Sequence, residues 1–274
     1  MPIKRMYLAF YQLRELPFNL TPDPRFLYYS AHHRDAYDHL MYGISHRKGF
    51  IELTGEVGSG KTTLCRAVLN DLDKSVETAI ILNPALTGTQ LLKAMLNDFG
   101  LEARSRDRLG CIESLNRFLL ERTRSGCNVA LFIDEAQDLS PDLMEQVRLL
   151  SNLETDQHKL IQIILCGQPE LKQRLERPDL RQLKQRITIR YHIPPLSVED
   201  TGQYIRHRLT VAGAEDADLF DPSAVREVHA YAMGCPRMIN ALCDTSLLAG
   251  YATELRRLNA KCVRQAIREL EGQA

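Results

Sequence analysis

The stretch Gly55-Glu56-Val57-Gly58-Ser59-Gly60-Lys61-Thr62 has the spacing GxxxxGK, followed by Thr, of a phosphate-binding loop. The strand-like run Phe50–Leu53 precedes it, and a helical pattern follows it. Glycines let the backbone curl so that successive N–H groups face phosphate oxygens, and the dipole of the following helix favours the same anions. We therefore expect residues Gly55 to Thr63 to bind nucleotide phosphates. Lys61 should reach the β- and γ-phosphates, and the Thr62 hydroxyl should bind Mg²⁺.

Short apolar runs alternate with longer helical patterns over residues 34 to 193. This alternation predicts an α/β fold, with a parallel five-stranded sheet that carries helices on both faces. The run Val129–Ile133 lacks polar alternation, which is typical of a strand buried on both faces. The expected strands are Phe50–Leu53, Ala79–Leu82, Val129–Ile133, Ile161–Leu165 and Ile187–Ile193. The expected helices are Arg34–His46, Lys61–Leu72, Thr89–Phe99, Ile112–Arg124, Pro141–Asn152 and Pro169–Lys184.

The chain is expected to have three parts. Residues 1–48 hold an aromatic and proline-rich segment and a first helix, which should pack on the core. Residues 49–196 form the nucleotide-binding core. Beyond Pro194-Pro195 the strand patterns stop, so residues 197–274 are expected to be a small all-helical lid domain. Helix starts are expected there at Ser197, Asp221-Pro222, Cys235-Pro236 and Asn259.

The composition is that of an ordinary globular protein. The 274 residues are 44% hydrophobic and 26% charged, which excludes a disordered chain, and 35 basic residues balance 35 acidic ones, which argues against a generally basic nucleic-acid coat. The longest apolar runs are about five residues, whereas a membrane span needs roughly twenty, so no transmembrane helix is expected. Seven scattered cysteines without a Cys-x-x-Cys pair predict a reducing, cytoplasmic location and no structural metal.

Two polar positions follow strands of the expected sheet. Asp134 ends the most hydrophobic strand, where its carboxylate can bind Mg²⁺ beside Thr62, directly or through water. The adjacent Glu135 can orient and deprotonate the water that attacks the γ-phosphate. Gln168 follows the fourth strand, and ligands of parallel sheets bind at the carboxyl ends of strands. Its amide is therefore expected either to reach the attacking water or γ-phosphate, or only to cap a loop.

A basic segment and a separate arginine are the remaining candidate functional residues. Lys172–Arg190 carries seven basic residues against two acids. From the residues alone, this segment is a solvated face, a nucleic-acid patch, or a subunit edge that supplies an arginine to a neighbour's nucleotide. Arg237 begins a helix of the lid domain, in Gly234-Cys235-Pro236-Arg237, and is a candidate to bend back over the phosphates.

In this order, these elements resemble an AAA+ ATPase, whose corresponding parts are named Walker A, Walker B, sensor 1, arginine finger and sensor 2. The similarity extends to the ExeA-type (general secretion pathway protein A) subfamily and covers nearly the whole chain. It is carried by Tyr7–Phe18, Thr21–Tyr28, Leu53–Leu64, Ile133–Gln137, Gly167–Leu171 and Leu183–Ile187.

The resemblance implies a role for each matching residue. Lys61 and Thr62 would bind phosphate and Mg²⁺, Asp134 would serve Mg²⁺, and Glu135 would be the base. Gln168 takes the sensor 1 place, and Arg237 takes the sensor 2 place. Arg186 is the expected arginine finger because it ends the helix before the fifth strand, with Arg181 as the alternative. Pro17-Phe18 and the Pro194-Pro195 hinge are expected to flank adenine.

The resemblance also implies an ATP hydrolase that uses ATP/ADP and Mg²⁺ and forms a nucleotide-dependent homo-oligomer, either a ring or a filament. Such a motor would drive assembly of a secretion, pilus or exopolysaccharide machine of the cell envelope through a protein partner. It would lie in the cytoplasm, or peripherally at the inner membrane through that partner. ExeA-type proteins often continue into a membrane helix and a peptidoglycan-binding segment, whereas this chain stops at Ala274, as the short soluble members do.

Two alternatives stay open. One is a DNA-binding AAA+ regulator similar to the transposon target-selection ATPases of the MuB and TniB kind, with Arg104–Arg108 and Arg117–Arg124 as further phosphate contacts. The other is a nucleotide switch with little turnover. The zero net charge and the ExeA-like opening favour the secretion-type motor. The loop Asn83–Gly88 lacks an aromatic-glycine pair, which argues against a protein-threading unfoldase.

Overall fold

The computed structural model describes residues 6–102, 107–154 and 159–272. The chain forms two compact units. The sheet unit comprises Arg34–Gly55 and Leu64–Ile193. The helical unit comprises Met1–His33, Glu56–Thr63 and Pro194–Ala274. Within the described ranges, no helix is both long enough and apolar enough to cross a membrane.

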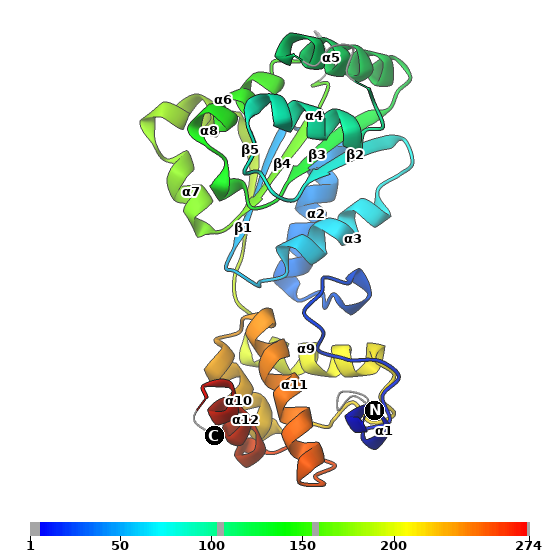
Figure 1. The fold of residues 1–274 in the computed structure, drawn as a ribbon, viewed down its shortest axis with the longest axis vertical. Coiled ribbons are helices and arrows are strands. Elements are labelled where there is room, and N and C mark those ends of the chain that lie inside the picture. The colour runs from blue at the N-terminus through cyan, green and yellow to red at the C-terminus, as the bar shows by residue number, and fades with distance from the viewer. Residues whose placement is uncertain (1–5, 103–106, 155–158, 273–274) are drawn as a thin grey trace. The chain divides into compact units, whose positions relative to one another are not determined.

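The sheet unit is built on five parallel strands in the order β2-β3-β4-β1-β5, which confirms the predicted fold class (Figure 1). The three central strands are buried along their whole length, which accounts for their largely apolar sequences. The edge strand β5 alternates between buried and exposed positions. The bounds are β1 Phe50–Gly55, β2 Val76–Ile81, β3 Asn128–Ile133, β4 Gln162–Gly167 and β5 Ile187–Ile193.

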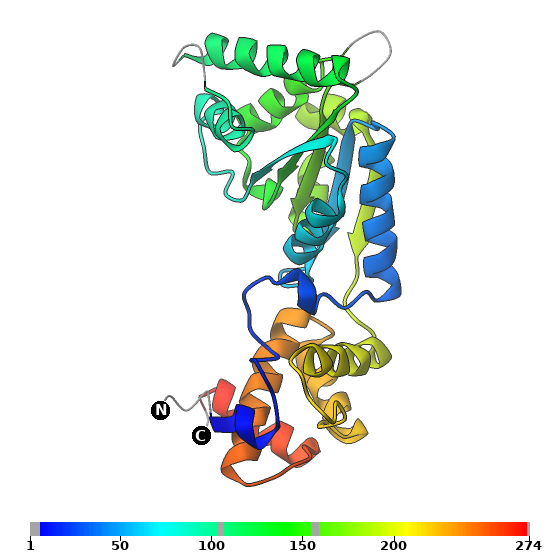
Figure 2. The ribbon, with the colours of Figure 1, turned by 90° about the vertical axis from the view of Figure 1, so that its right-hand side faces the viewer.

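Helices cover both faces of the sheet (Figure 2). On one face, α4 (Gly88–Asp98), α5 (Arg108–Arg124), α6 (Pro141–Leu150) and α7 (Pro169–Leu175) share a single apolar core with β3 and β4. On the other face lie α2 (Ala31–Ser45) and α3 (Lys61–Asp71). Gly43 allows α2 to approach the sheet, because a Cβ there would lie 2.4 Å from Ile51 Cδ1.

The single helix predicted over Pro169–Lys184 is wrong. The segment forms three elements: α7 ends at Leu175 and is followed by the 3-10 turn η4 (Pro178–Leu180) and by α8 (Arg181–Arg186). Pro178 lacks an N–H and disfavours a helical conformation of the residue before it, and Arg177 is accordingly extended. Elsewhere the helix bounds shift by a few residues; α5, for example, begins at Arg108 because Asp107 caps it.

The helical unit contains the four C-terminal helices that the sequence predicts. Their starts follow from capping: Ser197 and Asp200 form a reciprocal capping box, and the side chains of Asp221 and Asn259 each accept two backbone N–H bonds. Pro222 stands at the first helical position of α10. The helices are α9 Val198–Val211, α10 Pro222–Ala232, α11 Pro236–Ala252 and α12 Ala260–Leu270.

The N-terminal segment was expected to pack on the nucleotide-binding core, but its rings lie in the core of the helical unit. It forms α1 (Met6–Phe10) and the 3-10 turn η2 (Pro24–Phe26), and Tyr7 and Phe26 are buried among the C-terminal helices. The buried Arg208 of α9 explains this docking. Its guanidinium donates to the carbonyls of Pro17 and Asn19 and stacks 4.8 Å from the Phe26 ring centre.

Candidate functional site

The phosphate-binding loop joins β1 to α3, as the sequence predicts. Gly58 (φ +77°) and Gly60 (φ +96°) have left-handed backbones, which a glycine adopts without strain. The Ser59 N–H donates to the Glu56 carbonyl over 3.1 Å and closes a turn. Lys61 Nζ donates to the same carbonyl over 2.9 Å. The loop is thus a preformed curl, with its lysine folded against its own backbone.

The start of α11 lies against this loop within the helical unit. The Arg237 N–H donates to the Gly58 carbonyl over 3.2 Å, and Cys235 Sγ donates to the Val57 carbonyl over 3.2 Å. A Cβ at Gly58 would lie 2.3 Å from the Arg237 Cβ, so a glycine is needed at this contact. The structure therefore brings the backbone of Arg237 against the phosphate loop.

A second neighbour of the loop, His33, is one that sequence reasoning missed. His33 Nε2 lies 2.9 Å from the Ser59 carbonyl oxygen, and Nδ1 lies 2.8 Å from Ser30 Oγ. The imidazole is 3% exposed, and this burial lowers its pKa below the ordinary value. Sequence reasoning gave His33 no role. A usable signal was Ser30, three residues earlier, which has the spacing of an N-cap.

The acidic residues after β3 lie at the carboxyl end of the sheet. Asp134 is 8% exposed, and its N–H donates to the Ile81 carbonyl over 2.8 Å. Glu135 has a left-handed backbone (φ +49°), which is uncommon for a residue other than glycine. Its N–H donates to Asp134 Oδ1 over 3.0 Å. This bend turns the chain sharply at the predicted base.

Two glutamine amides hold the Glu135 carboxylate. Gln137 Nε2 donates to Glu135 Oε2 over 2.7 Å, and Gln168 Nε2 donates to the same oxygen over 3.2 Å. Gln137 Oε1 in turn accepts from the Gln168 N–H over 3.0 Å. A Cβ at Gly167 would lie 2.9 Å from Gln137 Oε1, so the glycine leaves room for this amide. The structure brings the predicted base and the predicted sensor 1 residue into contact, and it adds Gln137, to which sequence reasoning gave no role.

The basic segment Lys172–Arg190 is largely engaged within the chain. Arg186 donates to Ser151 Oγ and is half-buried, whereas Arg181 is exposed. Arg174 donates to the carbonyls of Gln137 and Leu139 and so supports the loop after Glu135. Three further basic residues form ion pairs: Lys184 with Glu176, Arg177 with Asp179, and Arg190 with Glu52.

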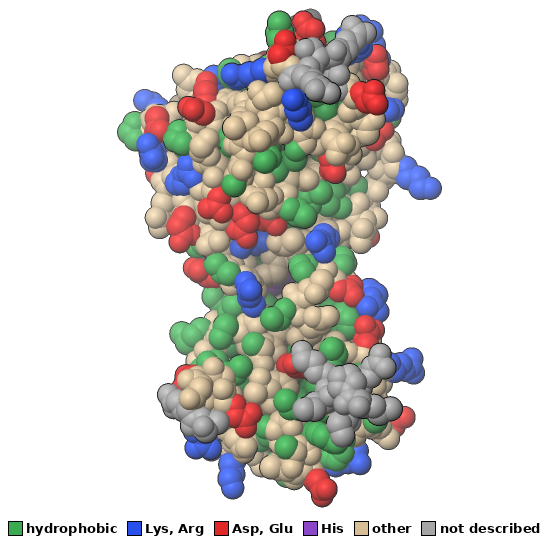
Figure 3. All heavy atoms as spheres, in the orientation of Figure 1, with side chains coloured by type: hydrophobic (Ala, Val, Ile, Leu, Met, Phe, Trp, Pro, Cys, Tyr) green, Lys and Arg blue, Asp and Glu red, His purple; other side chains and the backbone are tan. Residues whose placement is uncertain are grey.

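Two arginine segments are the expected DNA contacts, and the face shown in Figure 3 carries Lys and Arg side chains scattered among Asp and Glu. Of Arg104–Arg108, residues 104–106 lie outside the described residues. Within Arg117–Arg124, Arg122 pairs with Glu77 over 3.4 Å and stacks on the Phe118 ring. This mixed charge weakens the potential that a phosphate backbone would meet.

The residues expected to flank adenine lie in the helical unit. Phe18 is 2% exposed and packs edge-on against Phe220, with ring centres 6.2 Å apart. The Pro17 carbonyl accepts the Arg208 bond described above. The Phe18 ring therefore belongs to the core of this unit.

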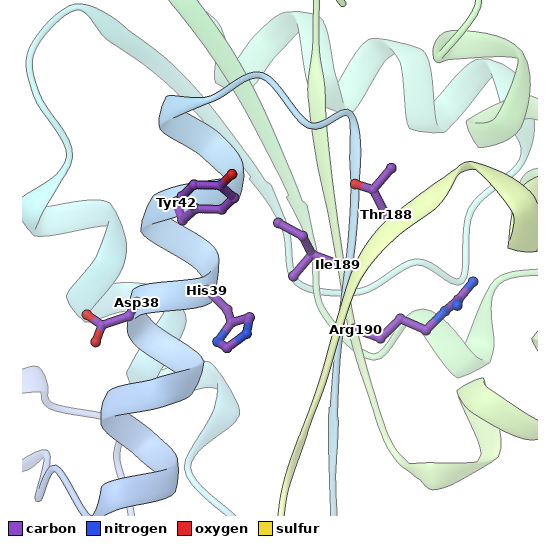
Figure 4. Close-up of a pocket in the computed structure, with 6 residues that line it drawn as sticks. All are labelled: Asp38, His39, Tyr42, Thr188, Ile189 and Arg190. Atoms are coloured by element: carbon purple, nitrogen blue, oxygen red, sulfur yellow. The ribbon is translucent and has the colours of Figure 1, made fainter.

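A separate pocket of about 530 Å³ lies between α2 and β5 (Figure 4). Asp38, His39 and Tyr42 line it from α2, and residues 188–190 line it from β5. Beside it, burial raises the pKa of Glu52, although Arg190 lies 3.3 Å away. None of the predicted site residues lines this pocket.

Comparison with known proteins identifies similar sequences. Residues 44–175 match a family model described as an AAA domain. The chain is 47% identical over 248 residues to general secretion pathway protein A of Aeromonas hydrophila. That match covers 90% of this chain but 45% of the relative, so the chain spans about half of that protein's length.

Solved structures with low sequence identity share the fold. Cdc6p from Pyrobaculum aerophilum gives a TM-score of 0.71 at 15% identity, over 92% of this chain and 70% of that one. ORC2 from Aeropyrum pernix in its ADP form gives 0.69 at 16% identity, over 92% and 72%. The RuvB branch migration motor of Thermotoga maritima gives 0.58 at 17% identity, over 86% and 69%.

Proposed function

The chain belongs to the AAA+ ATPases of the general secretion pathway protein A type, and from this we propose that it binds ATP with Mg²⁺ and hydrolyses it. The observation that carries the proposal is the contact between Glu135 and Gln168 at the carboxyl ends of the adjacent strands β3 and β4. In the same sheet, β1 runs directly into the phosphate loop. Parallel α/β sheets bind their ligands at this end.

The loop supplies the phosphate contacts. Its backbone N–H groups would bind the phosphates, and Lys61 would exchange its bond to the Glu56 carbonyl for phosphate oxygens. The Thr62 hydroxyl and the Asp134 carboxylate are oxygen donors of the kind that Mg²⁺ prefers. When bound, Mg²⁺ would neutralise charge that develops on the phosphates. Arg237, at the start of α11, would report the nucleotide state to the lid.

Glu135 would act as the general base. It takes a proton from water while the water oxygen bonds to the γ-phosphorus and the bond to the ADP oxygen breaks. Because the amides of Gln137 and Gln168 both bind Oε2, we assign Oε1 as the oxygen that accepts the proton. Gln168 would also orient the attacking water.

Hydrolysis is tested with Glu135→Gln, which keeps the shape of the side chain and removes the base. We expect turnover to fall by a factor of about a hundred or more while nucleotide binding persists. Glu170→Gln, which changes an exposed carboxylate of α7, is the matched control and should retain wild-type turnover. Unchanged turnover in Glu135→Gln would instead identify a nucleotide switch.

We further propose that ATP-dependent homo-oligomerisation, as a ring or filament, drives assembly of a secretion, pilus or exopolysaccharide machine. The name of the Aeromonas relative supports this class of process. Arg186 is the proposed arginine finger; it would have to leave Ser151 to reach a neighbouring subunit, whereas the exposed Arg181 would not. Seven free thiols support a cytoplasmic location, with attachment to the inner membrane through a partner.

Light scattering tests this proposal against its alternative, a DNA-binding regulator of the MuB and TniB kind. Molar mass is measured with ADP and with a non-hydrolysable ATP analogue, each with and without duplex DNA at moderate salt. Assembly that needs ATP and ignores DNA supports the secretion-type motor. Assembly that requires DNA would establish the regulator, despite the ion-paired state of Lys184, Arg177 and Arg190.

A further inference from the structure

Four consecutive carbonyls of the phosphate loop accept hydrogen bonds within the helical unit. The Glu56 carbonyl accepts from the Ser59 N–H and from Lys61 Nζ. The next three carbonyls accept from groups distant in sequence: Val57 from Cys235 Sγ, Gly58 from the Arg237 N–H, and Ser59 from His33 Nε2.

This pattern fixes the direction of the amides. In a planar trans peptide, the carbonyl and the N–H of the following residue point in opposite directions. A partner that holds the Ser59 carbonyl therefore turns the Gly60 N–H away from itself. The motif uses such N–H groups to bind phosphate. The bond from His33 to the Ser59 carbonyl therefore fixes the direction in which the Gly60 N–H points.

We propose that His33 is a positioning residue for phosphate binding, because its Nε2–H fixes the Ser59–Gly60 peptide so that the Gly60 N–H faces the bound nucleotide. The inference rests on the proposed function. His33 does not touch the substrate in this role and acts only through the Ser59 carbonyl, over 2.9 Å.

The contacts of His33 determine its tautomer. The Ser59 carbonyl can only accept, so Nε2 carries the proton and the neutral ring leaves Nδ1 as an acceptor. Ser30 Oγ, at 2.8 Å, donates to Nδ1, and the same oxygen accepts from the His33 backbone N–H. Ser30 therefore orients the ring that orients the loop.

The packing around the contact agrees with this role. His33, Ser30 and Ser59 are each no more than 3% exposed, so water does not compete for the bond. A Cβ at Gly60 would lie 3.3 Å from His33 Nε2, so the ring occupies the space beside the glycine. A side chain that only filled a core would not need a donor at this atom.

The test compares His33→Gln with His33→Asn in the full chain. The longer Gln side chain places its amide N–H where Nε2 lies, whereas the shorter Asn reaches only the position of Nδ1. Affinities for ADP and for adenosine, which lacks phosphates, are measured by calorimetry. We expect His33→Asn to weaken ADP binding about tenfold, as expected for one buried hydrogen bond, and to leave adenosine binding unchanged. His33→Gln should stay within about threefold of wild type.

The matched control is His32→Gln, which changes the exposed neighbouring histidine and should bind ADP like wild type. Equal ADP affinity of His33→Asn and wild type, or an equal loss for ADP and adenosine, would overturn the proposal. If wild type itself bound no ADP, the proposed function would fail, and the role of His33 would fail with it. If His33→Asn does not fold, the ¹⁵N signals of His33 in wild type decide, because a proton on Nδ1 in place of Nε2 contradicts the assignment.

Discussion

Replacing Gln137 with alanine should slow hydrolysis without weakening ATP binding. Gln137 makes the shorter of the two amide bonds to Glu135 Oε2, 2.7 Å against 3.2 Å for Gln168, and it is not part of the phosphate loop. A hydrogen bond to a charged group contributes about 1.5–3 kcal/mol. If the loss of this bond raises the activation free energy of hydrolysis by the same amount, kcat falls about ten- to hundredfold while KM stays unchanged.

The assay is steady-state phosphate release over a range of Mg²⁺–ATP concentrations. Gln173→Ala, which removes an exposed glutamine of α7, is the matched control. Wild-type kcat in Gln137→Ala, or a rise in KM with no change in kcat, would refute the orienting role.

Three further changes test the helical unit. Gly234→Ala should lower the free energy of unfolding by about 2 kcal/mol or more, because φ is +73° and the new Cβ would lie 2.2 Å from the Leu196 carbonyl; thermal denaturation should show this, and should show no loss in the helical control Gly202→Ala. Arg208→Ala should cost about 2 kcal/mol or more and expose the segment around Pro17 to proteases, whereas Arg206→Ala removes an exposed ion pair and should not; equal digestion would contradict this. Because burial lowers the pKa of His33, the unfolded chain binds the proton at a higher pH than the folded chain, so the free energy of unfolding should fall as the pH drops below about 6.5, and His33→Gln should flatten that slope in denaturant titrations.

The fold and the loop were predictable because their physical requirements are local. Strands buried on both faces are mostly apolar, and the unbroken apolar run Val129–Ile133 therefore identifies a central strand from composition alone. The left-handed backbone at Gly58 and Gly60 favours glycine, and both glycines are visible in the sequence motif. The break at Pro178 was also present in the sequence, but the apolar spacing continues across it into α8, and this favoured a single helix.

The contacts of the candidate site that the sequence did not predict depend on which segments the fold brings together. His33 binds a backbone carbonyl 26 residues away, and every residue type has such a carbonyl. Gln137 contacts Gln168 only because β4 places Gln168 and Gly167 beside it. Arg186 was selected from its position in the chain, whereas its hydrogen bond to Ser151 depends on how α8 packs.

The bonds from Cys235 and Arg237 join the start of α11 to the phosphate loop. If a bound nucleotide strengthens these bonds, it lowers the free energy of one placement of α11 relative to all others. Linkage is reciprocal, so a protein that binds the C-terminal helices and prefers that placement must raise nucleotide affinity by the same factor. A partner of the C-terminal helices would then set the nucleotide concentration at which the protein responds.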